Sequence, residues 1–138
     1  MDGRWVDGVW VEVGDRWAEL VHLGRGHTDH DLVVAVPDAG VVFAGDLVEQ
    51  GAPPDLEDAV IQEWPATLDA LLALRPRTVV PGHGDPVDAT FVAGQRAELA
   101  EVAALHAAVA RGELTATEAD RRSPYPGVPW PTPPISEA

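Results

Sequence analysis

Side chains that can bind a metal ion or move a proton are concentrated in the segment GRGHTDHDLVV, residues 24–34. Two histidines and two aspartates occur within five positions of it: His27, Asp29, His30 and Asp31. Four polar side chains so close in sequence cannot all face one point. A complete site must therefore use residues from elsewhere, and the candidates are Asp46 in FAGDLV and His83 in VVPGHGDP.

The elements that must position these residues follow from the pattern of apolar and turn-forming residues. Short strands are predicted at residues 9–13, 17–23, 32–36, 41–44 and 78–80. Helices are predicted at residues 65–75 and 89–111, with a turn or two more within 115–122. The prediction is a single partial domain over residues 1–122, followed by a Pro-rich extended tail over residues 123–138.

The order of these elements predicts that His27, Asp46 and His83 meet. Strands 32–36 and 41–44 are joined by a four-residue turn, so they should pair antiparallel and bring His27 close to Asp46. A helical crossover leads from strand 41–44 to strand 78–80, which favours a parallel pair. His83 then emerges on the same side of the sheet as Asp46, where ligand sites of α/β sheets lie.

Two imidazoles and a carboxylate suit Zn²⁺ or another divalent metal and leave a position open for water. The metal lowers the pKa of that water from about 15.7 towards about 7, which supplies hydroxide to attack a carbonyl or similar centre. The same donors occur in two-His-one-carboxylate iron oxygenases, but the strand-rich jelly-roll pattern of those enzymes is missing here. The favoured chemistry is therefore metal-dependent hydrolysis.

Composition excludes several other function classes. The chain has 138 residues and a formal net charge of −14, and an acidic surface repels the phosphates of nucleic acids. No apolar run approaches the roughly 20 residues that span a bilayer, and acidic residues near the start argue against a secretory signal. Cysteine is absent, which suits a reducing cytoplasm. We expect a cytoplasmic protein with a small-molecule substrate.

The motifs GHTDHDLVV, FAGDLV and VVPGHGDP, in this order and spacing, resemble the carboxyl-terminal half of a metallo-β-lactamase-fold hydrolase. The resemblance covers about residues 9–90. It implies that His27 binds a first metal, that Asp46 bridges two metals and orients the attacking hydroxide as the catalytic residue, and that His83 binds the second. Zinc is the metal it favours, one or two ions, with Mn or Fe as alternatives. His30 and Asp31 are expected to support these ligands or to shape the loop.

One part of the family pattern is missing, because the chain contains no HxHxDH motif. The family fold is an αββα sandwich of two similar halves, so the resemblance implies an α/β fold forming half of that sandwich, a mixed sheet flanked by helices. The implied function is hydrolysis of an ester, thioester, lactone or lactam-like substrate by metal-bound hydroxide. The alternative is a truncated, non-catalytic fragment or subunit.

A half-sandwich would expose the inner face of its sheet to water, and large exposed apolar patches mark interfaces. We therefore expect the chain to self-associate, to bind a complementing amino-terminal half, or to be unstable alone.

Overall fold

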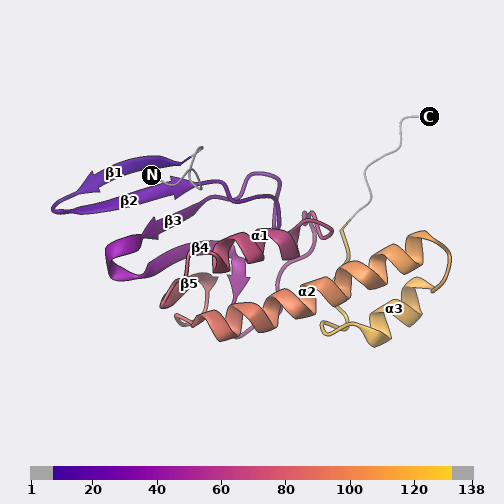
Figure 1. Ribbon diagram of the computed structural model, residues 1–138. Helices are drawn as coiled ribbons and strands as arrows, with labels where there is room; N and C mark the ends of the chain where they lie inside the picture. The colour runs from indigo at the N-terminus through magenta and orange to yellow at the C-terminus, as the bar shows by residue number, and fades with distance from the viewer. Residues whose placement is uncertain (1–7, 132–138) are drawn as a thin grey trace, which may run out of the picture.

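Five strands form one mixed sheet in the computed structural model, which describes residues 8–131 (Figure 1). The strands are β1 (Val9–Val13), β2 (Arg16–Val21), β3 (Val33–Val36), β4 (Val41–Glu49) and β5 (Thr78–His83). The helices are α1 (Trp64–Leu72), α2 (Ala89–Ala110) and α3 (Ala116–Arg122), with a 3-10 turn η1 (Pro37–Ala39). Neighbours in the sheet are neighbours in sequence, β1-β2-β3-β4-β5. The expected α/β class and mixed sheet are confirmed.

The connections predicted from turn chemistry are present. β3 and β4 pair antiparallel across η1, which ends at Gly40 in the left-handed region at φ 67°, where the Gly40 N–H donates to the Pro37 carbonyl. β4 and β5 pair parallel, with α1 in the crossover between them. Asp88 caps α2 by accepting a hydrogen bond from the Phe91 backbone N–H at 2.9 Å. The turn, crossover and helix-cap residues in the sequence were therefore sufficient to predict these connections.

Several element ends differ from the prediction: β2 ends at Val21 rather than at residue 23, and α1 ends at Leu72 rather than at residue 75. The largest differences between strand ends are in β4 and β5. β4 does not end at residue 44 but continues to Glu49, and β5 does not end at residue 80 but continues to His83. The β4–β5 register shifts on both sides of Gly45, which has a φ of 56°. A bulge of this kind lets a strand continue past a glycine while it changes direction. Asp46 thus lies within a bent strand rather than in a loop after it.

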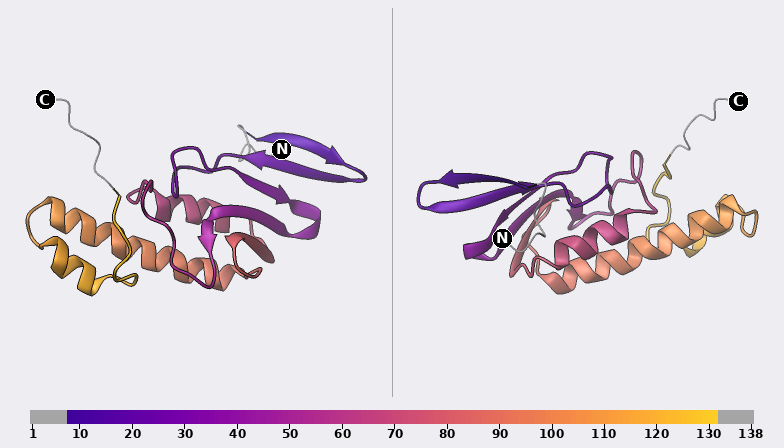
Figure 2. Two further views of the ribbon diagram at one scale, coloured as in Figure 1. Left: turned by 180° about the vertical axis from the view of Figure 1, so that it is seen from behind. Right: turned by 45° about the horizontal axis from the view of Figure 1, so that its top comes forward.

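One face of the sheet carries the core. A row of paired residues across all the strands, Trp10, Glu19, Ala35, Val42 and Val79, marks this face. Its last three members join the buried cluster with Leu68 of α1 and Leu99 of α2. Figure 2 shows α1 and α2 together against this side of the sheet. The helices therefore cover the face on which the sheet residues are buried.

The opposite face is apolar and uncovered in the part of the chain that the structure describes. The neighbouring row consists of Val9, Leu20, Val34, Phe43 and Val80, paired in that order across the strands. No member of this row belongs to the core cluster or packs against it. Val9 is 61% exposed and Phe43 46%. We call this row the open face, and such a patch is typical of an interface.

Replacing Phe43 by Lys is expected to shift the isolated chain towards the monomer, because a charge at the centre of the open face opposes its burial against another surface. Sedimentation velocity over a range of concentrations measures this, and the unmodified chain should associate as concentration rises. Phe91→Lys, at an exposed phenylalanine on α2, is the matched control and should leave association unchanged. A monomeric unmodified chain with one cooperative melting transition would contradict the expectation.

Glu19 is a buried charge on the core side of the sheet. Its side chain is 1% exposed, and neither of its carboxylate oxygens has a hydrogen-bond partner among the described residues. The indole N–H of Trp10, its cross-strand neighbour, is likewise buried without a partner there. Burial raises the pKa of Glu19 above its usual value of 4.5. The ionised carboxylate therefore costs stability at neutral pH.

Glu19→Leu is expected to raise the free energy of unfolding at pH 7 by about 1–3 kcal/mol, the typical cost of a buried unpaired polar group. Because the pKa is higher in the folded state, the folded chain binds more protons than the unfolded chain, so stability falls as pH rises above 4.5. The Leu variant should lack this fall. Urea unfolding between pH 4.5 and 8 measures both effects, with Glu12→Leu on exposed β1 as control. If the free energy of unfolding changed with pH equally in the unmodified chain and in Glu19→Leu, Glu19 would not be the source of the pH dependence.

The carboxyl-terminal part of the described chain has no strand or helix after α3, yet it packs against the rest of the molecule. Tyr125 belongs to the buried cluster. Trp130 stacks on His106 of α2 with ring centroids 3.6 Å apart. The remainder of the predicted extended tail, residues 132–138, lies outside the described residues, as do residues 1–7. Within residues 8–131, no helix has the length and apolar character needed to cross a membrane.

Candidate metal centre

The carboxylate of Asp46 lies between two histidines. Its Oδ2 is 3.4 Å from His27 Nε2, and its Oδ1 is 3.3 Å from His83 Nδ1. His27 comes from the loop before β3, Asp46 from the bent part of β4, and His83 from the last position of β5. The structure thus brings together the three side chains that the strand connections predicted would meet.

The orientation of His27 is set by a backbone carbonyl. Its Nδ1 lies 3.2 Å from the Asp55 carbonyl oxygen, and because a carbonyl can only accept, Nδ1 carries the hydrogen. Nε2 then faces Asp46, with an edge-on contact to Trp64 at 6.0 Å between ring centroids. A carbonyl partner of this kind is usual for a histidine that binds a metal through its other nitrogen.

The loop that carries His27 is fixed against α1. The Gly26 carbonyl accepts a hydrogen bond from the Val60 N–H at 2.7 Å, and Thr67 Oγ1 donates to the Arg25 carbonyl at 2.6 Å. A Cβ at Gly26 would come within 2.7 Å of Leu47 and 3.0 Å of Trp64. Only a glycine allows the loop to approach the helix this closely.

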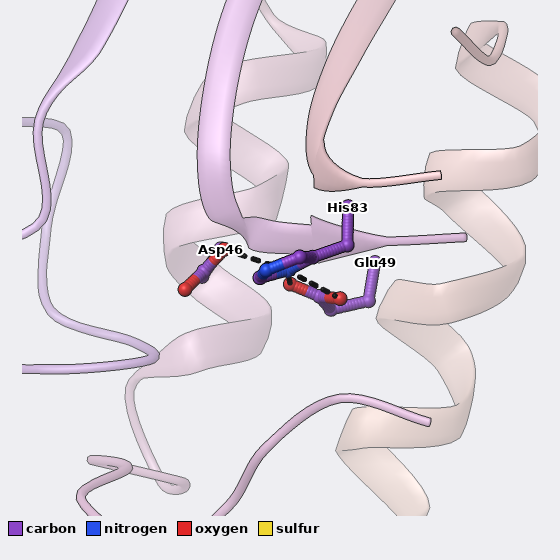
Figure 3. Close-up of side chains that lie close together, drawn as sticks. All are labelled: Asp46, Glu49 and His83. Atoms are coloured by element: carbon purple, nitrogen blue, oxygen red, sulfur yellow. Dashed lines mark hydrogen bonds and ion pairs between the residues drawn. The ribbon is translucent and has the colours of Figure 1, made fainter. Parts of the chain in front are cut away.

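Glu49 is a member of the centre that the sequence did not reveal. Its carboxylate oxygens lie 3.0 and 3.1 Å from His83 Nδ1, and the residue is only 8% exposed. Figure 3 shows the His83 ring in contact with the carboxylates of both Asp46 and Glu49. Ligand atoms of these three residues all lie within 4.8 Å of one another. Glu49 was not among the residues that the sequence predicted for the site, and the only signal for it was its position three residues after Asp46.

The electrostatics of the cluster favour a cation. Burial raises the pKa of Glu49, and the neighbouring Asp46 carboxylate raises it further, against the hydrogen bond from His83. The hydrogen bond to Glu49 in turn raises the pKa of His83. Two carboxylates this close repel each other, so positive charge between them, from an imidazolium or a metal ion, stabilises the arrangement.

The spacing of the donors fits a divalent metal. Ligand atoms about 2.0–2.2 Å from a tetrahedral zinc ion lie about 3.4 Å from one another. The two nitrogen-to-oxygen separations at Asp46 are 3.4 and 3.3 Å. With Nδ1 turned to the Asp55 carbonyl, His27 directs Nε2 towards Asp46, which is the nitrogen that would bind an ion held between these two residues. Imidazole and carboxylate donors suit Zn, Mn and Fe(II).

Gly82 makes room for Asp46. A Cβ at this position would overlap Asp46 Oδ1 and come within 2.9 Å of the Asp46 backbone nitrogen. The constraint is one of space, because Gly82 does not have a positive φ. β4 and β5 therefore approach closely at the centre, and the small residue before His83 is what permits it.

The two predicted supporting residues lie in the loop, and within residues 8–131 their side chains form no hydrogen bond or ion pair with the three central side chains. His30 is exposed and its Nδ1 lies 2.6 Å from Asp29 Oδ1. Asp31 Oδ2 accepts a hydrogen bond from the Thr28 N–H at 2.9 Å. Asp31 thus has a contact that holds the turn after His27.

Comparison with known proteins gives one family. The sequence model of the metallo-beta-lactamase superfamily matches residues 2–83. A metallo-beta-lactamase type 2 of Bacteroides fragilis is 33% identical over 84 residues, which make up 57% of this chain and 34% of that protein. A metallo-beta-lactamase type 2 of Bacillus cereus is 31% identical over 83 residues, 56% of this chain and 32% of that protein.

Solved structures agree with these sequence matches. The metallo-beta-lactamase from Pontibacter korlensis superposes with a TM-score of 0.62 at 25% identity and covers 69% of this chain and 46% of that one. The DIM-1 metallo-beta-lactamase superposes with a TM-score of 0.59 at 28% identity. The chain spans about a third of the length of the curated relatives it matches and less than half of these solved structures.

Proposed function

Because the chain belongs to the metallo-beta-lactamase superfamily, we propose that it supplies the metal centre of a metal-dependent hydrolase. The observation that carries this proposal is the Asp46 carboxylate, which turns one oxygen towards His27 Nε2 and the other towards His83 Nδ1. In this proposal His27, Asp46 and His83 are the metal ligands, and zinc is the ion that the donor set favours.

The chain's own residues divide the work of the centre. A divalent ion held there would supply Lewis acidity, which lowers the pKa of bound water towards about 7. Asp46 orients the attacking water by accepting its hydrogen bond, and the Asp55 carbonyl keeps the His27 Nε2 lone pair directed at the centre. In the metal-free chain the Glu49 carboxylate holds His83 Nδ1 at 3.0 Å and so fixes the orientation of that ring, and an ion held at the centre would take the place of the hydrogen between these two atoms.

The substrate we propose is an ester, thioester, lactone or lactam-like small molecule, because activated water attacks such carbonyl carbons. The similar proteins are named as β-lactamases, and that name describes them. We further propose that the open face packs on a second sheet, either a complementing amino-terminal half or a second copy of the chain. A non-catalytic subunit that retains the fold is the alternative.

Metal binding and hydrolysis by the 138-residue chain test this proposal. The chain is freed of metal with a chelator, titrated with Zn²⁺, Mn²⁺ and Fe²⁺, and assayed with nitrocefin, an aryl ester, a lactone and a thioester. Stoichiometric binding with chelator-sensitive hydrolysis supports the proposal. Binding without hydrolysis of any of these favours the non-catalytic subunit. Absence of binding would overturn the assignment of the centre.

A further inference from the structure

Gln95 of α2 is a buried polar residue that reaches across to the end of β4. The residue is 5% exposed and lies among apolar neighbours on the helix, with Val92 and Leu99 buried on either side of it. Its Oε1 lies 3.3 Å from the Glu49 backbone nitrogen, and its Nε2 lies 3.4 Å from the Glu49 carbonyl oxygen. One amide side chain thus accepts from and donates to the backbone of a single residue.

This pairing does for Glu49 what a neighbouring strand would do. Glu49 is paired with His83 of β5, and the Gln50 N–H donates to the His83 carbonyl, so the backbone groups of Glu49 itself face the other side of the strand. The pairing of β3 with β4 reaches only to Phe43, so these groups need other partners. Gln95 supplies both of them from a helix, where its position is fixed by the core. Loss of the amide would leave a buried N–H and a buried carbonyl unpaired.

Glu49 transmits this constraint to the metal centre. Its carboxylate holds His83 Nδ1 at 3.0 Å, and the Gln50 N–H donates to the His83 carbonyl oxygen at 3.1 Å. The backbone of Glu49 is therefore fixed from the helix side, while its carboxylate fixes the ring of His83. Glu49 contacts both Gln95 and His83, so any movement of its backbone moves the histidine.

We propose that Gln95 is a positioning residue of the metal centre, which acts on His83 through Glu49. The consequence of this for metal binding rests on the proposed function. A core residue that only filled space would need no amide at this position, since leucine or methionine would pack as well. The two hydrogen bonds to the Glu49 backbone give the amide a directional role there, beside its hydrogen bond with the Tyr125 hydroxyl. Partners one contact removed from metal ligands typically change metal affinity about 10- to 100-fold when they are replaced.

The test compares Gln95→Met, which keeps the length of the side chain, with Gln95→Glu, which when ionised keeps an acceptor but loses the donor. Leu99→Ala is the control, because Leu99 is buried one turn further along α2 and belongs to the apolar core cluster. Each chain is measured in three ways: affinity for Co²⁺ followed by its visible absorption, urea stability, and ¹⁵N NMR of the His83 ring in the metal-free chain.

Gln95→Met should weaken Co²⁺ binding about 10-fold or more and shift the ¹⁵N signals of the His83 ring. Gln95→Glu should show the same change to a smaller degree. Leu99→Ala should lose stability. Its Co²⁺ affinity should stay within about twofold of the unmodified chain, and its His83 signals should not change. Unchanged His83 signals in both Gln95 variants, or equal changes in Leu99→Ala, would overturn the proposal. If the unmodified chain binds no Co²⁺, the proposed function fails, and the NMR comparison alone decides the role of Gln95.

Discussion

Replacing Asp46 by Asn is expected to abolish stable metal binding and every hydrolytic activity of the chain. Asparagine has the same shape but no charge, and only one of its two terminal atoms can bind a cation. Asp46 turns its two oxygens towards two different histidines, so the variant loses a donor on one side and the negative charge on both. We expect metal affinity to fall at least about 100-fold, which corresponds to about 2.8 kcal/mol.

Calorimetric titration with Zn²⁺ measures the loss of metal affinity, and urea unfolding of the metal-free chain shows whether the fold is also affected. Asp46→Asn should unfold at nearly the same urea concentration as the unmodified chain, because the relief of repulsion with Glu49 offsets the loss of the ion pairs of Asp46 with the two histidines. Asp85→Asn, at an exposed aspartate two residues after His83, is the matched control and should bind as the unmodified chain does. Retention of affinity by Asp46→Asn within threefold would remove Asp46 from the centre.

Gly82→Ala is expected to disrupt the centre and to destabilise the fold at the same time. A methyl group at this position would overlap the Asp46 carboxylate, and the backbone nitrogen 2.9 Å away cannot move without shifting β4. Overpacking of this kind costs about 1–3 kcal/mol. Because the carboxylate must turn away from His83, we also expect metal affinity to fall about 10-fold or more.

Gly94→Ala is the control for this substitution, since a Cβ on that helical residue meets nothing within 4 Å. Alanine there should stabilise α2 by about 0.5–1 kcal/mol and leave metal affinity unchanged. Urea unfolding and Zn²⁺ titration of both variants distinguish a loss of space at the centre from a general effect of adding a methyl group. Equal behaviour of the two alanine variants would show that Gly82 has no special role.

Most of the secondary structure could be predicted because its signals are local. Turns with glycine, the Asp88 cap and the apolar periodicity of residues 89–111 are properties of neighbouring residues, and they placed β1, β3 and α2 to within one residue at each end. The ends of β4 and β5 could not be predicted in this way. Gly45 and Pro81 end strands in most contexts, and only the pairing of the two strands with each other carried them further.

The sequence by itself determined that His27, Asp46 and His83 gather at one edge of the sheet. A four-residue turn makes an antiparallel pair, and a helical crossover makes a parallel one, so the connections alone place these three residues. The tertiary structure decided which atoms face one another. Glu49 contacts His83, which is 34 positions away in the sequence, and Gln95 contacts Glu49 from 46 positions away. The Asp55 carbonyl determines which nitrogen of His27 carries the hydrogen. Contacts at such separations depend on how helices and sheet pack, which no local pattern encodes.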